Sequence, residues 1–266
     1  MKYLYLSLLS LLAVYLLVLL FIYFNQRNLL YHPGDNNYLD DKVQFSYKEV
    51  LVEVDQDIKL RSWLIEKDLE KYKTLVFFHG NAGNLFNRVH KLNELNKLDI
   101  NILIISWRGF SGNSGKPTEK NLYQDAQKSI EWLNNKGIKN EKIILYGESL
   151  GTGVAVELGQ KNIFNSIILE SPFTSMAKTA KIYYPYLPVN FLLKDKYDSI
   201  NKIDKITKPV LIMHGMKDDL VPYIMSVELF NKANEPKYSF FPKNDNHMMD
   251  FNDELLNKIR LFIQQH

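Results

Sequence analysis

The sequence predicts a doubly wound α/β domain with a mostly parallel sheet, preceded by one transmembrane helix. Three observations support this fold class. A long uncharged stretch begins at Tyr3 near the N-terminus, two strand-like segments follow it as a hairpin, and apolar runs then alternate with stretches of helical periodicity. Such alternation is typical of parallel strands joined by crossover helices.

The N-terminal segment predicts a membrane anchor over residues 1–26. The 22 residues from Tyr3 to Phe24 carry no charge and would form a helix of roughly 33 Å, enough to cross a bilayer. A cleaved signal peptide has a shorter apolar region and a small-residue cleavage site, which Phe21–Asn25 does not offer. We therefore expect a single-pass anchor with residues 3–24 in the lipid bilayer. Lys2 lies on one side and Arg27 on the other, so the positive-inside rule leaves the orientation open.

The remaining residues, 27–266, are expected to form one large α/β domain that begins with a β-hairpin. Tyr47–Val54 and Ile58–Ile65 are strand-like and flank a short polar turn. Six further apolar runs predict strands of the parallel sheet, at Thr74–Phe78, Ile100–Trp107, Lys142–Tyr146, Ser166–Leu169, Pro209–Met213 and Tyr238–Phe241.

Helices are predicted where apolar residues recur three or four positions apart, because that spacing places them on one helix face. One long interruption, residues 171–206, is expected to form a cap-like segment over a site. The apolar positions of the three clearest helices are Leu85, Val89, Leu92 and Leu95, then Leu122, Ala126, Ile130 and Leu133, and finally Phe251, Leu255, Ile259 and Phe262.

Composition narrows the class of protein. Hydrophobic residues make up 46% of the chain, which excludes a disordered protein. With 33 Lys and Arg against 30 Asp and Glu, the net charge of +3 gives no reason to expect a nucleic-acid partner. The absence of cysteine excludes disulfides and thiolate metal sites. With no phosphate-binding loop in the sequence, we expect neither a cofactor nor a metal, and protein partners stay unknown.

A candidate nucleophile lies in Gly147-Glu148-Ser149-Leu150-Gly151. This pentapeptide follows an apolar strand and opens a helix of small residues, which is the setting of a nucleophile elbow. Glycines on both sides of Ser149 would relieve crowding in a strained turn and leave its hydroxyl exposed above the sheet.

The residues that would activate Ser149 are expected beyond other strands, because reacting groups gather at the carboxyl ends of a parallel sheet. Asp218 follows the run that ends at Met213, and His247 follows the last strand. Ser149, Asp218 and His247 occur in the order that this kind of site uses. His247 would take the proton of Ser149, and Asp218 would hold the imidazole tautomer. Asp219 and then Asp245 are the alternatives to Asp218.

Two backbone amides are expected to stabilise an oxyanion. Leu150, directly after Ser149, supplies one. The glycine-rich loop His79–Asn84 supplies the other, for which we favour Asn81 over Ala82. His79 and His214 each precede a glycine at a strand end and are expected to be structural histidines rather than bases.

These motifs together resemble the α/β-hydrolase family, in particular its membrane-anchored branch of palmitoyl-protein thioesterase-like and serine aminopeptidase-like hydrolases. The resemblance runs from about Arg27 to the C-terminus. Ser106-Trp107 departs from the Asp-Tyr that the family usually has before Arg-Gly, a change that concerns loop support. The motifs are Leu30–Pro33, His79–Asn84, Arg108–Pro117, Gly147–Gly151, Glu170–Phe173 and the loops of Asp218 and His247.

The resemblance implies a serine hydrolase that cleaves an acyl ester or thioester through an acyl-enzyme intermediate. The apolar part of the cap-like segment suggests that Tyr184, Phe191 and Leu192 bind the substrate. A serine peptidase of the same fold is an alternative and would need an acidic cluster near the cap. A catalytically silent, membrane-tethered scaffold is a third hypothesis. The natural substrate, its acyl-chain length and the oligomeric state stay open.

Overall fold

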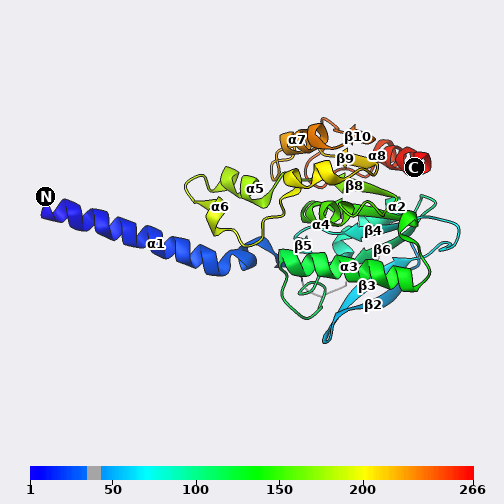
Figure 1. Cartoon of the computed structure of the whole chain (residues 1–266), viewed down its shortest axis with the longest axis horizontal. Helices are drawn as coiled ribbons and strands as arrows, with labels where there is room; N and C mark the ends of the chain where they lie inside the picture. Colours follow the sequence, from blue (N-terminus) through cyan, green and yellow to red (C-terminus); the bar gives the residue numbers. More distant parts are fainter. Residues whose placement is uncertain (35–42) are drawn as a thin grey trace.

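The computed structural model describes residues 1–34 and 43–266 (Figure 1). Its centre is an eight-stranded sheet in the order β10-β9-β8-β7-β4-β6-β3-β2. Strands β2 and β3 form the predicted antiparallel hairpin, β3 is antiparallel to β6, and the other neighbours are parallel. The predicted fold class is confirmed. The strands are β2 (Lys48–Asp55), β3 (Ile58–Ile65), β4 (Thr74–Phe78), β6 (Asn101–Ile105), β7 (Ile143–Glu148), β8 (Ser166–Glu170), β9 (Val210–Met213) and β10 (Lys237–Phe240).

Helices cover both faces of this sheet, because the central strands bury side chains on both sides. In β4, Val76 and Phe78 join one apolar cluster while Leu75 and Phe77 join the other. The first cluster includes residues of α3, α4 and α7, and the second includes residues of α2 and α8. The helices are α2 (Val89–Leu95), which follows the 3-10 turn Leu85–Arg88, α3 (Glu119–Asn135), α4 (Leu150–Gly159), α7 (Ile224–Lys232) and α8 (Asp253–Gln265).

The first helix, α1 (Lys2–Leu30), projects away from the domain (Figure 1). It is long and apolar enough to cross a membrane, and none of its most apolar 18-residue window is buried. It continues beyond residue 26, where we expected the anchor to end. It leads into β1 (His32–Pro33), which pairs in parallel with β5 (Ala82–Gly83).

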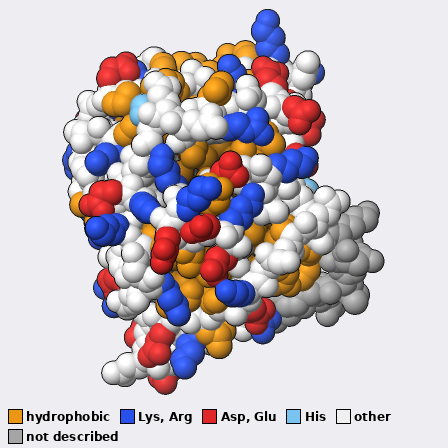
Figure 2. Space-filling view, turned by 90° about the vertical axis from the view of Figure 1, so that its right-hand side faces the viewer, with side chains coloured by type: hydrophobic (Ala, Val, Ile, Leu, Met, Phe, Trp, Pro, Cys, Tyr) orange, Lys and Arg blue, Asp and Glu red, His pale blue; other side chains and the backbone are white. Residues whose placement is uncertain are grey.

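The cap-like segment contains two short helices, α5 (Met176–Tyr183) and α6 (Val189–Leu192). Both lie beside the C-terminal half of α1 (Figure 1). The face of the molecule that points away from α1 is different in character, since side chains of both charges are interspersed over it (Figure 2).

Candidate active site

Ser149 lies in a sharp turn between β7 and α4. Its backbone has φ 50° and ψ −115°, a region that costs a non-glycine residue about 1–3 kcal/mol. The amide of Ser149 donates to the carbonyl of Glu170 at 2.8 Å, which ties the turn to β8. A Cβ atom at Gly151 would lie 1.9 Å from the carbonyl oxygen of Phe78. Only glycine therefore allows the helix to start this close to β4.

Three polar side chains from separate loops form one hydrogen-bonded chain. Ser149 Oγ lies 3.0 Å from His247 Nε2, and His247 Nδ1 lies 2.6 Å from Asp218 Oδ2. Because Asp218 accepts at Nδ1, that nitrogen carries the imidazole proton and Nε2 accepts from the Ser149 hydroxyl. The structure thus brings together the three residues that the sequence singled out.

The loop that carries Asp218 is hydrogen-bonded to the loop that carries His247. The amide of Lys217 donates to the carbonyl of Asp245 at 2.9 Å. A Cβ atom at Gly215 would lie 2.4 Å from that same carbonyl oxygen, so glycine permits the close approach. Ser171 Oγ donates to the carbonyl of His247 at 2.7 Å and fixes the histidine loop from the side of β8.

The alternative acids do not join this chain. Asp219 is exposed, and its backbone carbonyl accepts from the hydroxyl of Tyr183 at 2.9 Å. Asp245 accepts instead from the amide of Asp250 at 3.0 Å and shapes its own loop. The geometry therefore favours Asp218.

His214 is a buried neighbour of the acid. Its Nε2 lies 2.7 Å from Asp218 Oδ2 and 2.9 Å from the carbonyl of Val221, while Nδ1 lies 2.6 Å from Ser226 Oγ. Both neighbours of Nε2 are acceptors, so Nε2 donates. The ring is structural, as expected, but it supports Asp218 directly, which the sequence analysis did not foresee.

Asp218 is held in its ionised form. Burial alone would raise the pKa of its carboxyl, but the hydrogen bonds from His214 and His247 and the amide of Val221 outweigh it and lower the pKa. Its side chain has no exposed surface. A buried, fully hydrogen-bonded carboxylate of this kind can orient an imidazole and stabilise its protonated form.

His79 is also structural. Its Nδ1 lies 2.8 Å from the carbonyl of Gly80, and the amide of Trp107 approaches its Nε2 at 3.4 Å. Burial lowers the pKa of His79 to about 3, so the ring stays neutral. The indole N–H of Trp107 donates to the carbonyl of His79 at 3.0 Å. The unusual Ser106-Trp107 pair therefore supports the glycine-rich loop.

The amides of Asn81 and Leu150 belong to residues that line a pocket with Ser149. Neither amide donates a hydrogen bond within the described part of the chain. The side-chain amide of Asn81 donates to the carbonyl of Leu30 at 2.7 Å, and the Asn81 carbonyl accepts from His32 at 2.8 Å. The loop is thus fastened to the C-terminal end of α1.

The pocket over Ser149 has a volume of about 350 Å³. Tyr184 and Leu192 line it, as expected for substrate-binding residues, but Phe191 does not. The side chain of Phe191 is 91% exposed, because α6 turns it outward. Apolar side chains from α1, α5, α6 and the loop after Asp218 make up most of the wall, including Ile22, Leu29, Leu30, Phe173, Met176, Ala180, Leu187, Val189, Leu193, Leu220 and Val221.

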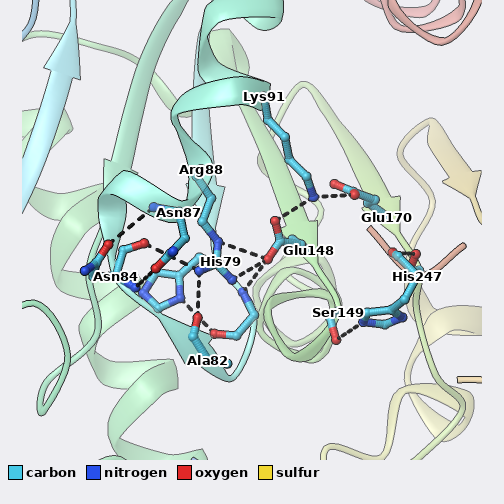
Figure 3. Close-up of polar contacts among 12 residues, drawn as sticks. His79, Ala82, Asn84, Asn87, Arg88, Lys91, Glu148, Ser149, Glu170 and His247 are labelled. Atoms are coloured by element: carbon cyan, nitrogen blue, oxygen red, sulfur yellow. Dashed lines mark hydrogen bonds and ion pairs between the residues drawn. The ribbon is translucent and has the colours of Figure 1, made fainter. Parts of the chain in front are cut away.

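A buried ionic network lies beside the turn at Ser149 (Figure 3). Lys91 Nζ lies 2.7 Å from Glu148 Oε2 and 2.5 Å from Glu170 Oε1. Arg88 Nη2 lies 2.6 Å from Glu148 Oε1, which also accepts from the amide of Gly80 at 3.1 Å. The network joins the nucleophile turn to the glycine-rich loop.

The charges of this network depend on one another. Burial opposes the ionisation of Glu148, but Arg88 and Lys91 hold its pKa well below the usual range. The sequence analysis missed these residues. One signal was present, because Glu148 and Glu170 end adjacent buried strands and carboxylates in such positions require buried cations.

Among the described residues, no three His, Asp or Glu side chains are grouped to hold a metal ion.

Solved structures share the fold at low sequence identity. The Pyrococcus furiosus esterase Pf2001 superposes with a TM-score of 0.72 and 21% identity, covering 89% of this chain and 99% of the esterase. Est1E from Butyrivibrio proteoclasticus, solved with ferulic acid, superposes with a TM-score of 0.68 and 20% identity over 81% of this chain and 98% of its own.

Relatives at higher identity cover most of the chain. An uncharacterised protein of Mycobacterium tuberculosis is 34% identical over 93% of this chain and 90% of its own. Protein bem46 of Schizosaccharomyces pombe is 32% identical over 87% of this chain and 83% of its own length. The human alpha/beta hydrolase domain-containing protein 17B is 33% identical over 72% of this chain and 66% of its own length. The sequence profile of the prolyl oligopeptidase family matches residues 95–254, more than half of the chain. Together with the fold, these matches show that the chain belongs to the prolyl oligopeptidase family of α/β-hydrolases.

Proposed function

We propose that this hydrolase is a serine enzyme that cleaves an acyl ester or thioester. The observation that carries the proposal is the chain Ser149–His247–Asp218, which opens into an apolar pocket. A deep apolar pocket beside a nucleophile suits an acyl chain.

In the proposed mechanism, His247 Nε2 takes the proton of the Ser149 hydroxyl as Oγ attacks the acyl carbonyl carbon. The amides of Leu150 and Asn81 donate to the oxyanion that forms. The protonated His247 then gives its proton to the leaving alcohol or thiol, and the acyl group remains on Ser149. Water, deprotonated by His247, releases the carboxylic acid and restores the serine. Asp218 acts through His247 by fixing its tautomer.

The alternative of a peptidase needs a carboxylate free to bind a substrate amine. Asp195 is the acidic residue that lines the pocket. Its oxygens already accept from Arg27 at 2.9 and 3.1 Å and from Tyr31 at 3.2 Å. A carboxylate neutralised in this way is a poor amine receptor, so we favour the ester or thioester.

We also propose that α1 is a single-pass membrane anchor. It has the length and composition of a membrane span, and its N-terminal half projects away from the sheet (Figure 1). The pocket reaches it, since Ile22 and Gln26 belong to the pocket wall.

The test uses the full chain in mild detergent and a fluorophosphonate probe. Wild-type protein and the exposed-loop control Ser114→Ala should be labelled, and Ser149→Ala should not. Hydrolysis of p-nitrophenyl acyl esters and the corresponding thioesters, from two to sixteen carbons, should depend on Ser149. Equal labelling of Ser149→Ala and wild type would overturn the proposal. Absence of Ser149-dependent hydrolysis across both series would favour the silent scaffold.

A further inference from the structure

One face of α1 forms part of the pocket wall. Ile22, Gln26, Leu29 and Leu30 line the pocket, and their spacing of four, three and one places them on one side of a helix. Ile22 lies within the uncharged stretch that ends at Phe24. The pocket is therefore closed by the same helix that we propose to cross the bilayer.

The cap is fastened to α1 at two levels. Near the end of the helix, Gln26 Nε2 donates to the carbonyl of Leu192 at 3.0 Å, and its Oε1 accepts from the amide of Lys194 at 2.8 Å. Further toward the N-terminus, the hydroxyl of Tyr15 donates to the carbonyl of Tyr186 at 2.9 Å. Tyr15 precedes Phe24 by nine residues, or about 13 Å along a helix. The tip of the cap therefore reaches the level of the middle of the uncharged stretch.

The tip of the cap, residues 182–193, has the surface of a segment that lies in lipid. It contains no charged residue. Apart from Asn190, its exposed side chains are apolar or aromatic and include Phe191, 91% exposed, and Tyr186, 76% exposed. In water such a patch would be unfavourable, and exposed patches of this kind mark interaction sites.

Lysines border this segment on both sides, at Lys181 and Lys194. The ammonium group of Lys194 lies 4.0 Å from the centre of the Tyr23 ring, near the end of the uncharged stretch of α1. Lysine and tyrosine at the same level are typical of the membrane–water interface. The apolar part of the cap and the apolar part of α1 therefore end at the same level, near Lys194 and Tyr23.

We propose that residues 182–193 lie within the bilayer beside α1, and that an acyl chain enters the pocket directly from the hydrocarbon between them. The first part rests on the contacts and exposed surface above, and the second rests also on the proposed hydrolase function. The bilayer is favoured over a second protein copy because the apolar surface of the cap is continuous with that of a membrane helix. On this arrangement the substrate is an ester or thioester whose acyl chain already resides in the membrane.

The position of the cap is tested without catalysis. The chain has no cysteine, so Phe191→Cys and the control Leu261→Cys, on exposed α8, each carry a single thiol. In phosphatidylcholine vesicles, a membrane-impermeant maleimide should label Leu261→Cys at least tenfold faster than Phe191→Cys. Labelling after denaturation in SDS gives the total amount of reactive thiol in each variant. A bimane dye at 191, but not at 261, should be quenched by brominated lipids.

Protection of position 191 without quenching by brominated lipids would assign the cap to contact with a second copy and overturn the proposal. Equal labelling of the two positions would overturn it as well. Neither outcome bears on whether Ser149 is a nucleophile.

The entry route is tested with two esters that share a leaving group. Vesicles carrying 4-methylumbelliferyl oleate are compared with 4-methylumbelliferyl acetate in water. Ile22→Trp should lower the oleate-to-acetate turnover ratio about tenfold, since displacing two methylenes from the pocket is sufficient for that loss. Leu20→Trp, on another face of α1, should leave the ratio within twofold of wild type.

Equal oleate-to-acetate ratios for the two variants would show that α1 does not line the path by which the acyl chain enters the pocket. If the wild-type protein hydrolysed neither ester in a Ser149-dependent way, the hydrolase function would be rejected, and the proposed substrate route with it. The labelling result would still decide where the cap lies.

Discussion

At the scale of single residues, Asp218 accepts hydrogen bonds from four donors. Its Oδ2 accepts from His247 and His214, and its Oδ1 accepts from the amides of Leu220 and Val221 at 2.8 and 2.7 Å. Four donors around one buried carboxylate fix both its charge and its direction. Asp219, next in the chain, has no such environment.

Asp218→Asn is therefore expected to reduce turnover on the order of 10⁴-fold, as loss of this support does in a related triad, whereas Asp219→Asn should stay within a few-fold of wild type. The amide would present a donor where His247 needs an acceptor, which favours the wrong tautomer. The measurement is turnover of p-nitrophenyl acetate by the full chain in detergent. Equal losses in the two variants would refute the assignment of Asp218.

His79 gives a prediction on pH and stability. Its pKa is about 3 in the folded protein against 6.5 for the free side chain. Below pH 6.5 the unfolded chain gains a proton that the folded chain does not, so stability is complete above pH 6.5 and falls toward pH 3. The loss is about 1.4 kcal/mol per pH unit.

Urea unfolding in detergent at pH 7.5, 6.0 and 5.0 should therefore show a shallower pH slope for His79→Gln than for wild type. His32→Gln, a change at an exposed ring, should keep the wild-type slope. An unchanged slope in His79→Gln would mean that His79 is protonated in the folded protein.

At the scale of elements, the nucleophile turn is held by groups that do not touch the pocket. Glu148 ends β7, Glu170 ends β8, and Lys91 of α2 lies between them. The same Glu148 accepts from Gly80, so α2, two strands and the glycine-rich loop share one network. A displacement of any one of these elements would move Ser149 relative to Asn81.

Lys91→Met is expected to destabilise the fold by about 3–5 kcal/mol, because it leaves the buried carboxylate of Glu170 without its cation and leaves Glu148 with Arg88 alone. Lys97→Met, which removes an exposed pair with Glu94, should change stability by less than about 1 kcal/mol. Chemical denaturation compares the two variants. A loss below 1 kcal/mol for Lys91→Met would show that the network adds little.

Substitutions on the two faces of α6 should differ in their effect on acyl-chain preference. Leu192 lines the pocket and Phe191 points away from it. Leu192→Ser should depress turnover of p-nitrophenyl octanoate relative to acetate by about tenfold, because burying each methylene is worth about 0.8 kcal/mol. Tyr184→Ser should act in the same direction.

Phe191→Ser is the matched control and should leave the octanoate-to-acetate ratio unchanged in detergent. Equal proportional losses on both esters for all three variants would reject the acyl-pocket assignment.

At the scale of the whole molecule, α1 and the α/β domain form one structure. The end of α1 is joined to the glycine-rich loop through Leu30 and Asn81, and to the cap through Gln26 and an ion pair between Arg27 and Asp195. A flexible tether would show none of these contacts. The helix α1 is therefore part of the candidate site as well as the proposed membrane anchor.

We expect the full chain to stay in the membrane pellet after a carbonate wash and to become soluble when residues 1–26 are deleted, because an uncharged helix of this length inserts stably. The truncated protein should keep hydrolysis of short esters better than that of long ones, since it lacks Ile22 and Gln26 of the pocket wall. Recovery of a shortened soluble form from the native host would show that the segment is cleaved.

The sequence by itself determined the fold class, the order of strands along the chain and the two residues, Asp218 and His247, that join Ser149 in one hydrogen-bonded chain. Local patterns carry that information, because period-two and period-3.6 spacing reflect burial, and because strand ends of a parallel sheet share one edge. The eight predicted strands lie within two residues of those observed.

Only the tertiary structure decided which neighbours support those residues. His214 approaches Asp218 and Lys91 bridges Glu148 and Glu170 through packing between elements distant in the chain, and no local spacing encodes such contacts. The outward turn of Phe191 and the inward face of α1 were likewise set by how the cap lies on the helix. Side-chain direction in a short, irregular segment depends on what it packs against, and that is a property of the folded molecule.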